Sequence, residues 1–142
     1  MKSIFYQVMI VSAFFFANQL GAQSTAETSP WLKKQFETNW MEKGFEKIEA
    51  KISPCEITID VYGKNATKLF TTVFNPADTK WIGSDWSLYA KDKIVRDLKY
   101  DKSGDYYSSY RNFIGVSNKL EGEPDYPQKL AAALNRLATS CK

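Results

Sequence analysis

Hydrophobic and polar residues alternate most regularly in the stretch CEITIDVY, which runs from Cys55 to Tyr62. Its odd-numbered positions hold cysteine, isoleucine and valine, and Glu56, Thr58 and Asp60 lie between them. Because successive side chains of a strand point to opposite faces, this period of two predicts a strand with one buried face. The stretch TKLFTTVF predicts a return strand, and GKNA between the two is typical of a turn.

Three more stretches predict strands after the break NPAD. They are WSLYA, KIVRDLKY and DYYSSYRNFIGV, and the polar sequences KDK and DKSGD separate them as turns. Together with the first hairpin, they predict β-strands over residues 55–116.

A helical period precedes the strands. Ser29 and Pro30 are typical of a helix start, because a hydroxyl caps the first turn and proline is tolerated at the first helical position. Leu32, Phe36 and Trp40 then recur at helical spacing between charged residues. The sequence therefore predicts an amphipathic N-terminal helix.

Residues 44–52 admit two interpretations. Ile48, Ala50 and Ile52 alternate as they would in a strand. The residues around them are glutamate and lysine, which are good helix formers. We favour a continuous helix over residues 30–52.

The last stretch, QKLAAALNRLATSCK, predicts a C-terminal helix over residues 127–141. Four of its residues, at spacings of four, three and four, share one stripe of that helix: Leu130, Leu134, Leu137 and Cys141. Cys141 is therefore expected to face the core, as Cys55 does on the apolar face of its strand. A bridge between the two cysteines is then geometrically reasonable.

The N-terminal stretch MKSIFYQVMIVSAFFFANQLGAQ has the features of a secretory signal peptide. Lys2 precedes an uncharged apolar run, and the small residues Gly21 and Ala22 are typical of a cleavage site. Gln23 stands where a bacterial lipoprotein would need a cysteine. We therefore expect a periplasmic or extracellular protein without a lipid anchor.

The chain is therefore expected to have three parts. They are a signal peptide at 1–22, a linker at 23–29 and a single globular domain at 30–142. No second apolar stretch of membrane length follows the signal peptide, so we expect no integral membrane segment after its cleavage.

The two cysteines, Cys55 and Cys141, are expected to form a disulfide. An even number of cysteines in an oxidising compartment favours pairing, although free thiols or pairing between chains are the alternatives. Closing a loop of about 86 residues stabilises a fold by roughly 4 to 5 kcal/mol in the chain-entropy model.

The predicted order of elements defines an α+β fold class. Short strands followed by a terminal helix are typical of an antiparallel β-sheet or open barrel, here with an N-terminal amphipathic helix and a C-terminal capping helix. A β-run that starts at a cysteine, a strand ending in FNPAD and the terminal helix KLAAALNRLATSCK resemble small secreted domains of Bacteroidetes-type bacteria.

That resemblance covers residues 54–142 and implies a pleckstrin-homology-like (PH-like) barrel plugged by its C-terminal helix. It implies no catalytic residues. The turn GKNA departs from lipid-binding pleckstrin domains, because only Lys64 and Lys68 stand where a phosphoinositide site needs a basic cluster.

Composition excludes several kinds of chemistry. The chain has no histidine, which removes histidine bases, histidine-dependent nucleophiles and histidine zinc sites. Its formal net charge is +3 with both signs interspersed, so we expect no nucleic-acid partner. We predict no catalytic residues, no metal and no cofactor.

Carboxylates leave two minor alternatives. Glu56 and Asp60 share a strand face but lie roughly 13 Å apart, too far for a glycosidase pair, so we expect a solvated face there and surface charge at Asp97. Asp101 and Asp105 alternate with Ser103 as in a calcium loop, but no glutamate follows at the required distance, and we favour a hairpin turn.

Aromatic residues between positions 81 and 110 give the candidate ligand-binding residues. In strand geometry Tyr106 and Tyr110 lead to an apolar strand end, so we expect them in the core or at its rim. Tyr107 and Arg111 then share the outward face. The predicted ligand-binding set is Trp81, Trp86, Tyr107 and Arg111.

Two functions remain in contention. The first is a secreted or periplasmic, non-catalytic interaction module that binds a protein or peptide partner through a sheet edge or the N-terminal helix. The alternative is a module that binds a glycan or a small apolar ligand with Trp81, Trp86 and Tyr107. A hydrolase that uses carboxylates alone ranks below both.

Overall fold

The computed structural model describes residues 25–39, 45–116 and 125–142. The predicted signal peptide and Trp40 lie outside these residues. The described part has an α+β fold, as predicted, with a helix near each end and antiparallel strands between them. The helices are α2 (Thr25–Asn39) and α3 (Tyr126–Ala138). No helix of the described part is long and apolar enough to cross a membrane.

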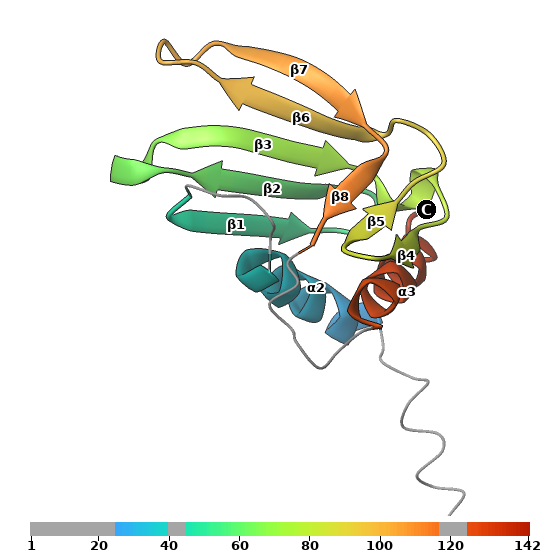
Figure 1. Ribbon diagram of the computed structural model, residues 1–142. Helices are drawn as coiled ribbons and strands as arrows, with labels where there is room; N and C mark the ends of the chain where they lie inside the picture. Colours follow the sequence, from blue (N-terminus) through green and yellow to red (C-terminus); the bar gives the residue numbers. More distant parts are fainter. Residues whose placement is uncertain (1–24, 40–44, 117–124) are drawn as a thin grey trace, which may run out of the picture.

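The strands form two antiparallel sheets that do not close into a barrel (Figure 1). The larger sheet has the order β1-β2-β3-β6-β7 and the smaller one β4-β5-β8. The larger sheet contains β1 (Lys47–Ile52), β2 (Ile57–Tyr62), β3 (Lys68–Phe74), β6 (Val95–Tyr100) and β7 (Tyr106–Arg111). The smaller sheet contains β4 (Ile82–Ser84), β5 (Ser87–Tyr89) and β8 (Phe113–Gly115). Two short 3-10 turns, η1 (Lys64–Ala66) and η2 (Pro76–Asp78), flank β3.

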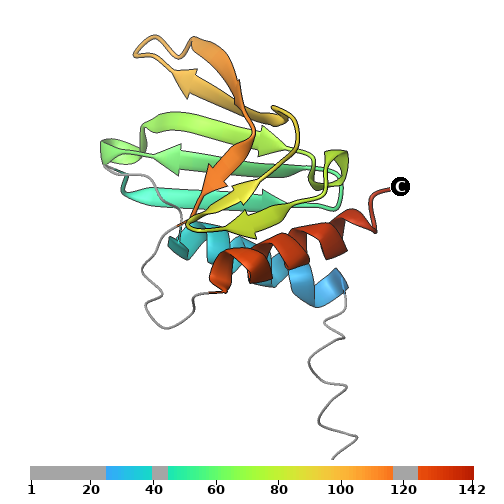
Figure 2. The same cartoon turned by 45° about the vertical axis from the view of Figure 1, so that its right-hand side comes forward.

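The two helices lie side by side below the β1 side of the larger sheet, and the smaller sheet stands in front (Figures 1 and 2). Helix α2 packs on β1, whereas α3 packs on β4 and β5. The far side of the larger sheet, formed by β6 and β7, extends beyond the helices. The core therefore fills only one half of the larger sheet.

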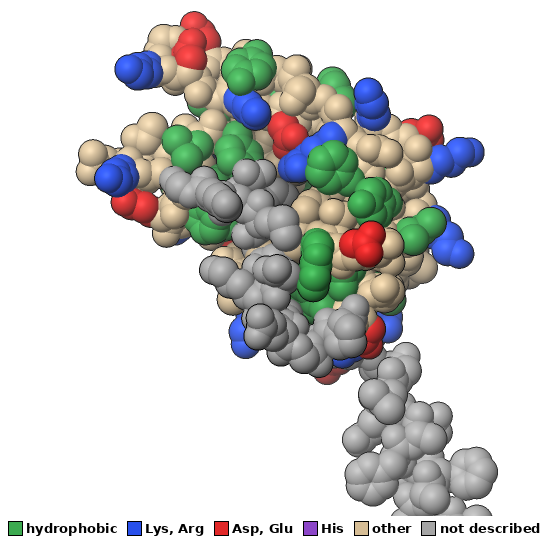
Figure 3. All heavy atoms as spheres, in the orientation of Figure 1, with side chains coloured by type: hydrophobic (Ala, Val, Ile, Leu, Met, Phe, Trp, Pro, Cys, Tyr) green, Lys and Arg blue, Asp and Glu red, His purple; other side chains and the backbone are tan. Residues whose placement is uncertain are grey.

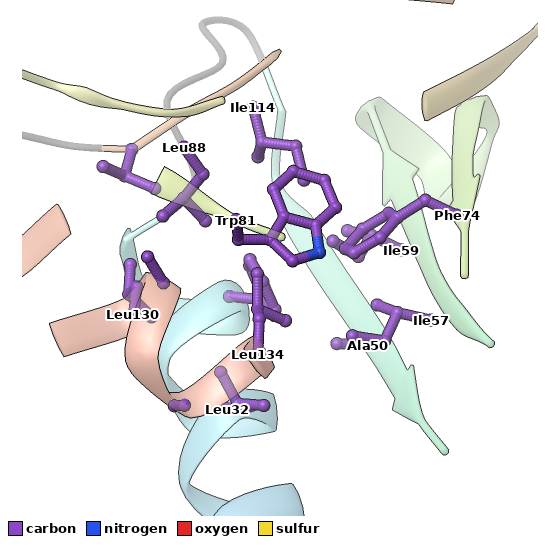
Figure 4. Close-up of a cluster of buried hydrophobic side chains, with 14 of the residues drawn as sticks. Leu32, Ala50, Ile57, Ile59, Phe74, Trp81, Leu88, Ile114, Leu130 and Leu134 are labelled. Carbon is purple, nitrogen blue, oxygen red and sulfur yellow. The ribbon is translucent and has the colours of Figure 1, made fainter. Parts of the chain in front are cut away.

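Trp81 lies at the centre of this core, with only 2% of its surface exposed (Figure 4). Its ring meets the edge of Phe74 at a centroid distance of 5.2 Å, and Phe74 meets Phe36 of α2 at 6.4 Å. The indole N–H donates to the carbonyl of Pro76 at 3.2 Å. Aliphatic residues from both sheets and both helices surround it, among them Leu32, Ile57, Ile59, Leu88, Ile114, Leu130 and Leu134.

Residues 47–52 form strand β1, so the predicted continuous helix over 30–52 is wrong. Strand β1 pairs antiparallel with β2, with Ala50 opposite Ile59. Ile48 and Ala50 are buried. Burial of this alternating face outweighs the helix propensity of the glutamates and lysines between these residues, because propensity is a weak local preference.

Helix α2 begins at Thr25, five residues before Pro30. Ser29 and Pro30 therefore do not start the helix, and residues 25–29 are helical instead of part of a linker. Proline inside a helix forgoes one backbone hydrogen bond. Thr28 is fully buried, which shows that the turn before the proline belongs to the packed structure.

Cys55 and Cys141 form the predicted disulfide, with their Cα atoms 4.9 Å apart. The bridge joins the segment just before β2 to the chain just beyond α3. It does not lie in the core as expected, because Cys55 is exposed and Cys141 is half-buried. Strand β2 begins at Ile57 and α3 ends at Ala138, so neither cysteine belongs to the regular element whose face we assigned to it.

The backbone of α3 rests directly on Gly83 of β4. A β-carbon added at Gly83 would lie 2.1 Å from the carbonyl oxygen of Pro127 and 2.4 Å from the nitrogen of Gln128. Backbone atoms cannot move aside as a flexible side chain can. We therefore expect Gly83→Ala to lower the free energy of unfolding by about 2 kcal/mol or more, measured by urea unfolding.

The matched control is Gly63→Ala, where the nearest atoms are at the end of the Leu69 side chain, 3.1 Å away. We expect this variant to lose less than about 1 kcal/mol, since Leu69 can shift. Equal stability of Gly83→Ala and the wild-type protein would show that α3 does not depend on this close approach.

Candidate functional site

The structure separates the four predicted ligand-binding residues. Trp81 lies in the core and does not reach the surface. Trp86 is 52% exposed and belongs to the turn between β4 and β5. Tyr107 and Arg111 lie together on β7 and share one face, as their spacing predicted.

Tyr107 and Arg111 line a pocket of about 410 Å³ on the half of the larger sheet that the helices leave uncovered. Strand β6 adds Asp97 and Lys99, and β3 adds Phe70. Leu69 and Tyr100 complete the lining. In Figure 3, hydrophobic, basic and acidic side chains lie next to one another on this part of the surface.

Asp97 is 9% exposed, so the expectation of surface charge there is wrong. It lines the pocket and bonds to side chains of the neighbouring strands β3 and β7. Its Oδ1 atom accepts a hydrogen bond from the Thr72 hydroxyl at 2.6 Å and one from Nη2 of Arg111 at 3.2 Å. Nε of Arg111 lies 2.8 Å from Oδ2 in the same ion pair, although its N–H is not aligned for a hydrogen bond. The Arg111 guanidinium also lies 5.4 Å from the centre of the Phe113 ring.

This ion pair leaves one cation of the pocket unmatched. Asp97 neutralises Arg111, whereas Lys99 is exposed and has no ion-pair partner in the described part of the chain. Tyr107 is 62% exposed beside it. The pocket therefore combines apolar and aromatic walls with a net positive charge, which suits a ligand with an anionic group.

Tyr106 and Tyr110 are 57% and 55% exposed, so the expectation that they face the core is wrong. They lie on the opposite face of β7 from the pocket. The predicted single strand breaks at Asn112, and Ile114 belongs to β8 in the other sheet. The alternation of side chains between faces therefore cannot be extended from Ile114 in β8 back to Tyr106 and Tyr110 in β7.

A polar cluster that the sequence did not indicate lies on this opposite face. Asp60, expected on a solvated strand face, is only 5% exposed. It accepts a hydrogen bond from the Thr71 hydroxyl at 2.6 Å and forms an ion pair with Lys68, whose Nζ is 3.1 Å from Oδ1. The same Nζ lies 5.6 Å from the ring centre of Tyr62 and 5.9 Å from that of Tyr100.

The surroundings of Lys68 stabilise its charge. Burial lowers its pKa, but the hydrogen bond and attraction to Asp60, together with Tyr62 and Tyr100, outweigh burial and raise the pKa of Lys68 above 10.5. A raised pKa in the folded state means that this charge stabilises the fold below about pH 10.5. The stabilisation is lost as the pH rises through the folded-state value.

The two outer edges of the larger sheet differ. At the β1 edge, the Ala50 N–H donates to Oε1 of Glu37 at 3.0 Å, and the Ala50 carbonyl accepts from Nζ of Lys33 at 3.0 Å. Lys33 and Glu37 are also paired with each other. Side chains of α2 thus satisfy the N–H and C=O groups of Ala50, which point away from β2.

No described element covers the β7 edge, which forms the free upper margin of the sheet in Figures 1 and 2. Asp101 donates its N–H to the Asp105 carbonyl at 2.8 Å, so hydrogen-bonded pairs with β6 recur at Tyr107 and Ser109. The residues between them point their N–H and C=O groups outward. These residues are Tyr106, Ser108 and Tyr110.

The sequence DKSGD forms the turn between β6 and β7, as favoured. Oδ1 of Asp101 accepts from both the N–H and the hydroxyl of Ser103, and Gly104 has a φ of 89°. The hydrogen bonds from Ser103 lower the pKa of Asp101. The described residues contain no group of three or more acidic or cysteine side chains that could hold a metal ion.

Glu37 makes stability depend on pH at the covered edge. Burial raises its pKa, but hydrogen bonds from Lys33 and from the Ala50 N–H outweigh burial and lower the pKa below 4.5. The carboxylate therefore stabilises the fold above pH 4.5, and this contribution disappears as the pH falls through the folded-state value.

We expect Glu37→Gln to lower the free energy of unfolding by about 1 kcal/mol at pH 7, and by less at pH 3, because protonation of the wild-type carboxylate increases as the pH falls. Urea unfolding at both pH values measures the difference. Glu46→Gln is the control, since Glu46 is exposed and has no ion pair in the described residues. If wild type and Glu37→Gln differ in unfolding free energy by the same amount at pH 7 and pH 3, the charge-dependent role of Glu37 is contradicted.

A double-mutant cycle tests the ion pair between Lys68 and Asp60, on the face of the sheet opposite the pocket. Among the described residues, Lys68→Met leaves the buried Asp60 with only the Thr71 hydroxyl as a side-chain partner, so we expect a loss of roughly 1 to 3 kcal/mol in urea unfolding. Adding Asp60→Asn removes the unmatched charge and should recover part of that loss. Additive effects of the two substitutions would show that the ion pair contributes nothing.

Comparisons with known proteins give no relative for this arrangement. No protein-family model matches the chain, and neither a curated protein nor a solved structure matches it. The resemblance to small secreted PH-like domains therefore stays a prediction.

Proposed function

We propose that this chain is a secreted or periplasmic, non-catalytic interaction module that binds an extended segment of a protein partner along β7. The observation that carries this proposal is the open edge of that strand. Tyr106, Ser108 and Tyr110 point backbone N–H and C=O groups outward there, and no described strand pairs with them. An added strand gains main-chain hydrogen bonds at such an edge, and neighbouring side chains supply specificity.

The contrast with β1 supports this proposal. Natural sheets protect their edges with charges, proline, bulges or a covering element, because an open edge recruits other strands. Helix α2 protects β1 through Lys33 and Glu37. Within residues 25–39, 45–116 and 125–142, strand β7 has none of these features over its first five residues, YYSSY, which are all exposed.

The absence of a convergent catalytic pair favours binding over hydrolysis. The buried carboxylates of the described part are Asp60 and Asp97. They lie on opposite faces of the sheet, and each is paired with a cation, Lys68 or Arg111. General acid–base catalysis needs such groups to converge on one substrate.

Two features favour an extracytoplasmic location. Disulfides persist in oxidising compartments, and Cys55–Cys141 is one. The N-terminal sequence from Lys2 to Ala22 has the order of charge, apolar run and small residues that directs secretion.

The pocket supports a second candidate, the binding of a small or glycan ligand with an anionic group. Of the residues first assigned to a ligand, Tyr107 and Arg111 line this pocket, and Lys99 adds an unmatched charge. Such a ligand would depend on the Tyr107 side chain and not on the outward backbone of β7. Tyr107→Ala therefore distinguishes it from a strand partner.

Ser108→Pro tests the proposed function. Proline removes the outward N–H of Ser108 without breaking the ladder to β6, because edge strands tolerate proline there. The probe is a displayed library of random linear peptides, selected on the full-length protein. We expect selected peptides to bind the wild-type protein and Ser108→Ala, and to lose at least about tenfold in affinity for Ser108→Pro.

Amide hydrogen exchange gives an independent measurement on the same complexes. Bound peptide should slow exchange at Tyr106, Ser108 and Tyr110, whose N–H groups face outward. Selected peptides that protect none of these amides, or that bind Ser108→Pro unchanged, would contradict strand addition at β7. Peptides lost only in Tyr107→Ala would favour the pocket instead.

A further inference from the structure

The sequence of the open edge strand β7 is nearly palindromic about Ser108. Tyr106 and Tyr110 lie two residues to either side of it, and Asp105 and Arg111 lie three residues to either side. The first pair is identical in chemistry and the second is opposite in charge. A strand with these properties complements a second copy of itself turned by 180°.

The outward backbone groups fit this symmetry. In an antiparallel pair centred on Ser108, that residue lies opposite Ser108 of the second copy, and Tyr106 lies opposite Tyr110. These are the β7 residues whose N–H and C=O groups face away from β6. Each such pair makes two backbone hydrogen bonds, so the pairing forms about six.

The side chains on both faces match in this register. On the face that carries the Asp60 cluster, each Tyr106 ring meets a Tyr110 ring, and aromatic cross-strand pairs contribute favourably. On the pocket face, Asp105 lies opposite Arg111 of the second copy. Asp105 is exposed, and Arg111 keeps Asp97 as its partner within the chain.

Registers shifted by two residues lose these matches. Centring the pairing on Tyr107 places Tyr106 opposite Ser108, and centring it on Ser109 places Ser108 opposite Tyr110. Both shifts separate Asp105 from Arg111. The register centred on Ser108 is therefore favoured by hydrogen bonding, by aromatic contact and by charge together.

We infer that the β7 edge of this chain pairs with the β7 edge of a second copy, so that two five-stranded sheets join into one continuous sheet across a twofold axis. This inference rests on the proposed function, because it names the occupant of the same edge. The pairing involves seven residues of each copy, Asp105 to Arg111, and such a small interface gives weak association. We expect a dissociation constant of about 10 µM to 1 mM.

Sedimentation velocity of the full-length protein from micromolar to submillimolar concentration tests the pairing. We expect the wild-type protein and Ser108→Ala to shift together from monomer to dimer. Ser108→Pro removes the central outward N–H groups of both copies. It should raise the dissociation constant at least about tenfold while its unfolding curve shows that the fold is intact.

Cysteine cross-linking fixes the register. In Ser108→Cys the new thiols of the two copies lie opposite each other across the axis, within the range that a disulfide can bridge. In Ser109→Cys the new thiol lies opposite Tyr107 of the second copy, on the other face of the strand. We expect air oxidation to give a covalent dimer of Ser108→Cys and little of Ser109→Cys.

The outcomes separate this inference from the proposed function. A wild-type protein that stays monomeric, a dimer that Ser108→Pro does not weaken, or equal cross-linking of both cysteine variants would overturn the pairing of two copies. If selected peptides still protect Tyr106, Ser108 and Tyr110 in that case, the edge binds a different partner and the proposed function stands. If neither copies nor peptides engage these amides, both fail.

Discussion

The position of Trp81 is the constraint on which the rest of this structure depends. Asn135 of α3 bonds to both backbone groups of Trp81, accepting from its N–H at 2.8 Å and donating to its carbonyl at 2.9 Å. The indole ring packs on Phe74 of the larger sheet. One residue thus ties the C-terminal helix to both sheets, and burial of a large aromatic ring makes this arrangement strongly favourable. Because α2 and α3 pack around Trp81, no helix of the described residues covers β6 and β7, which leaves an edge and a pocket open there.

Much of this fold was predictable where a whole face is buried. The period of two in β2 and the leucine stripe of α3 follow directly from burial, and both predictions agree with the structure. Strand β1 was missed because only Ile48 and Ala50 are buried, while the charged residues between them face outward on an edge strand. The local helix propensity of such a sequence is high, and only pairing with β2 determines that it forms a strand.

The candidate site was predictable in part. The alternation of faces was enough to place Tyr107 and Arg111 together, since both belong to one strand. It misplaced Tyr106 because the chain changes sheets after β7. The burial of Asp60 and Asp97 had no local signal, since their cations and hydroxyl donors come from other strands. Contacts between distant segments are what a local pattern lacks.

The disulfide divides the chain into a covalently closed ring and an N-terminal part outside it, and this division does not follow the layers of helices and sheets. Cys55 and Cys141 close a covalent ring that contains β2 to β8 and α3. Helix α2 and strand β1 precede Cys55 and lie outside that ring, although Leu32, Phe36 and Ala50 complete the core. The ring restricts the unfolded conformations of everything within it, whereas the N-terminal hairpin of helix and strand is held by noncovalent contacts alone. We therefore expect partial opening of the molecule to begin at α2 and β1, whereas the β7 edge lies within the covalently closed ring.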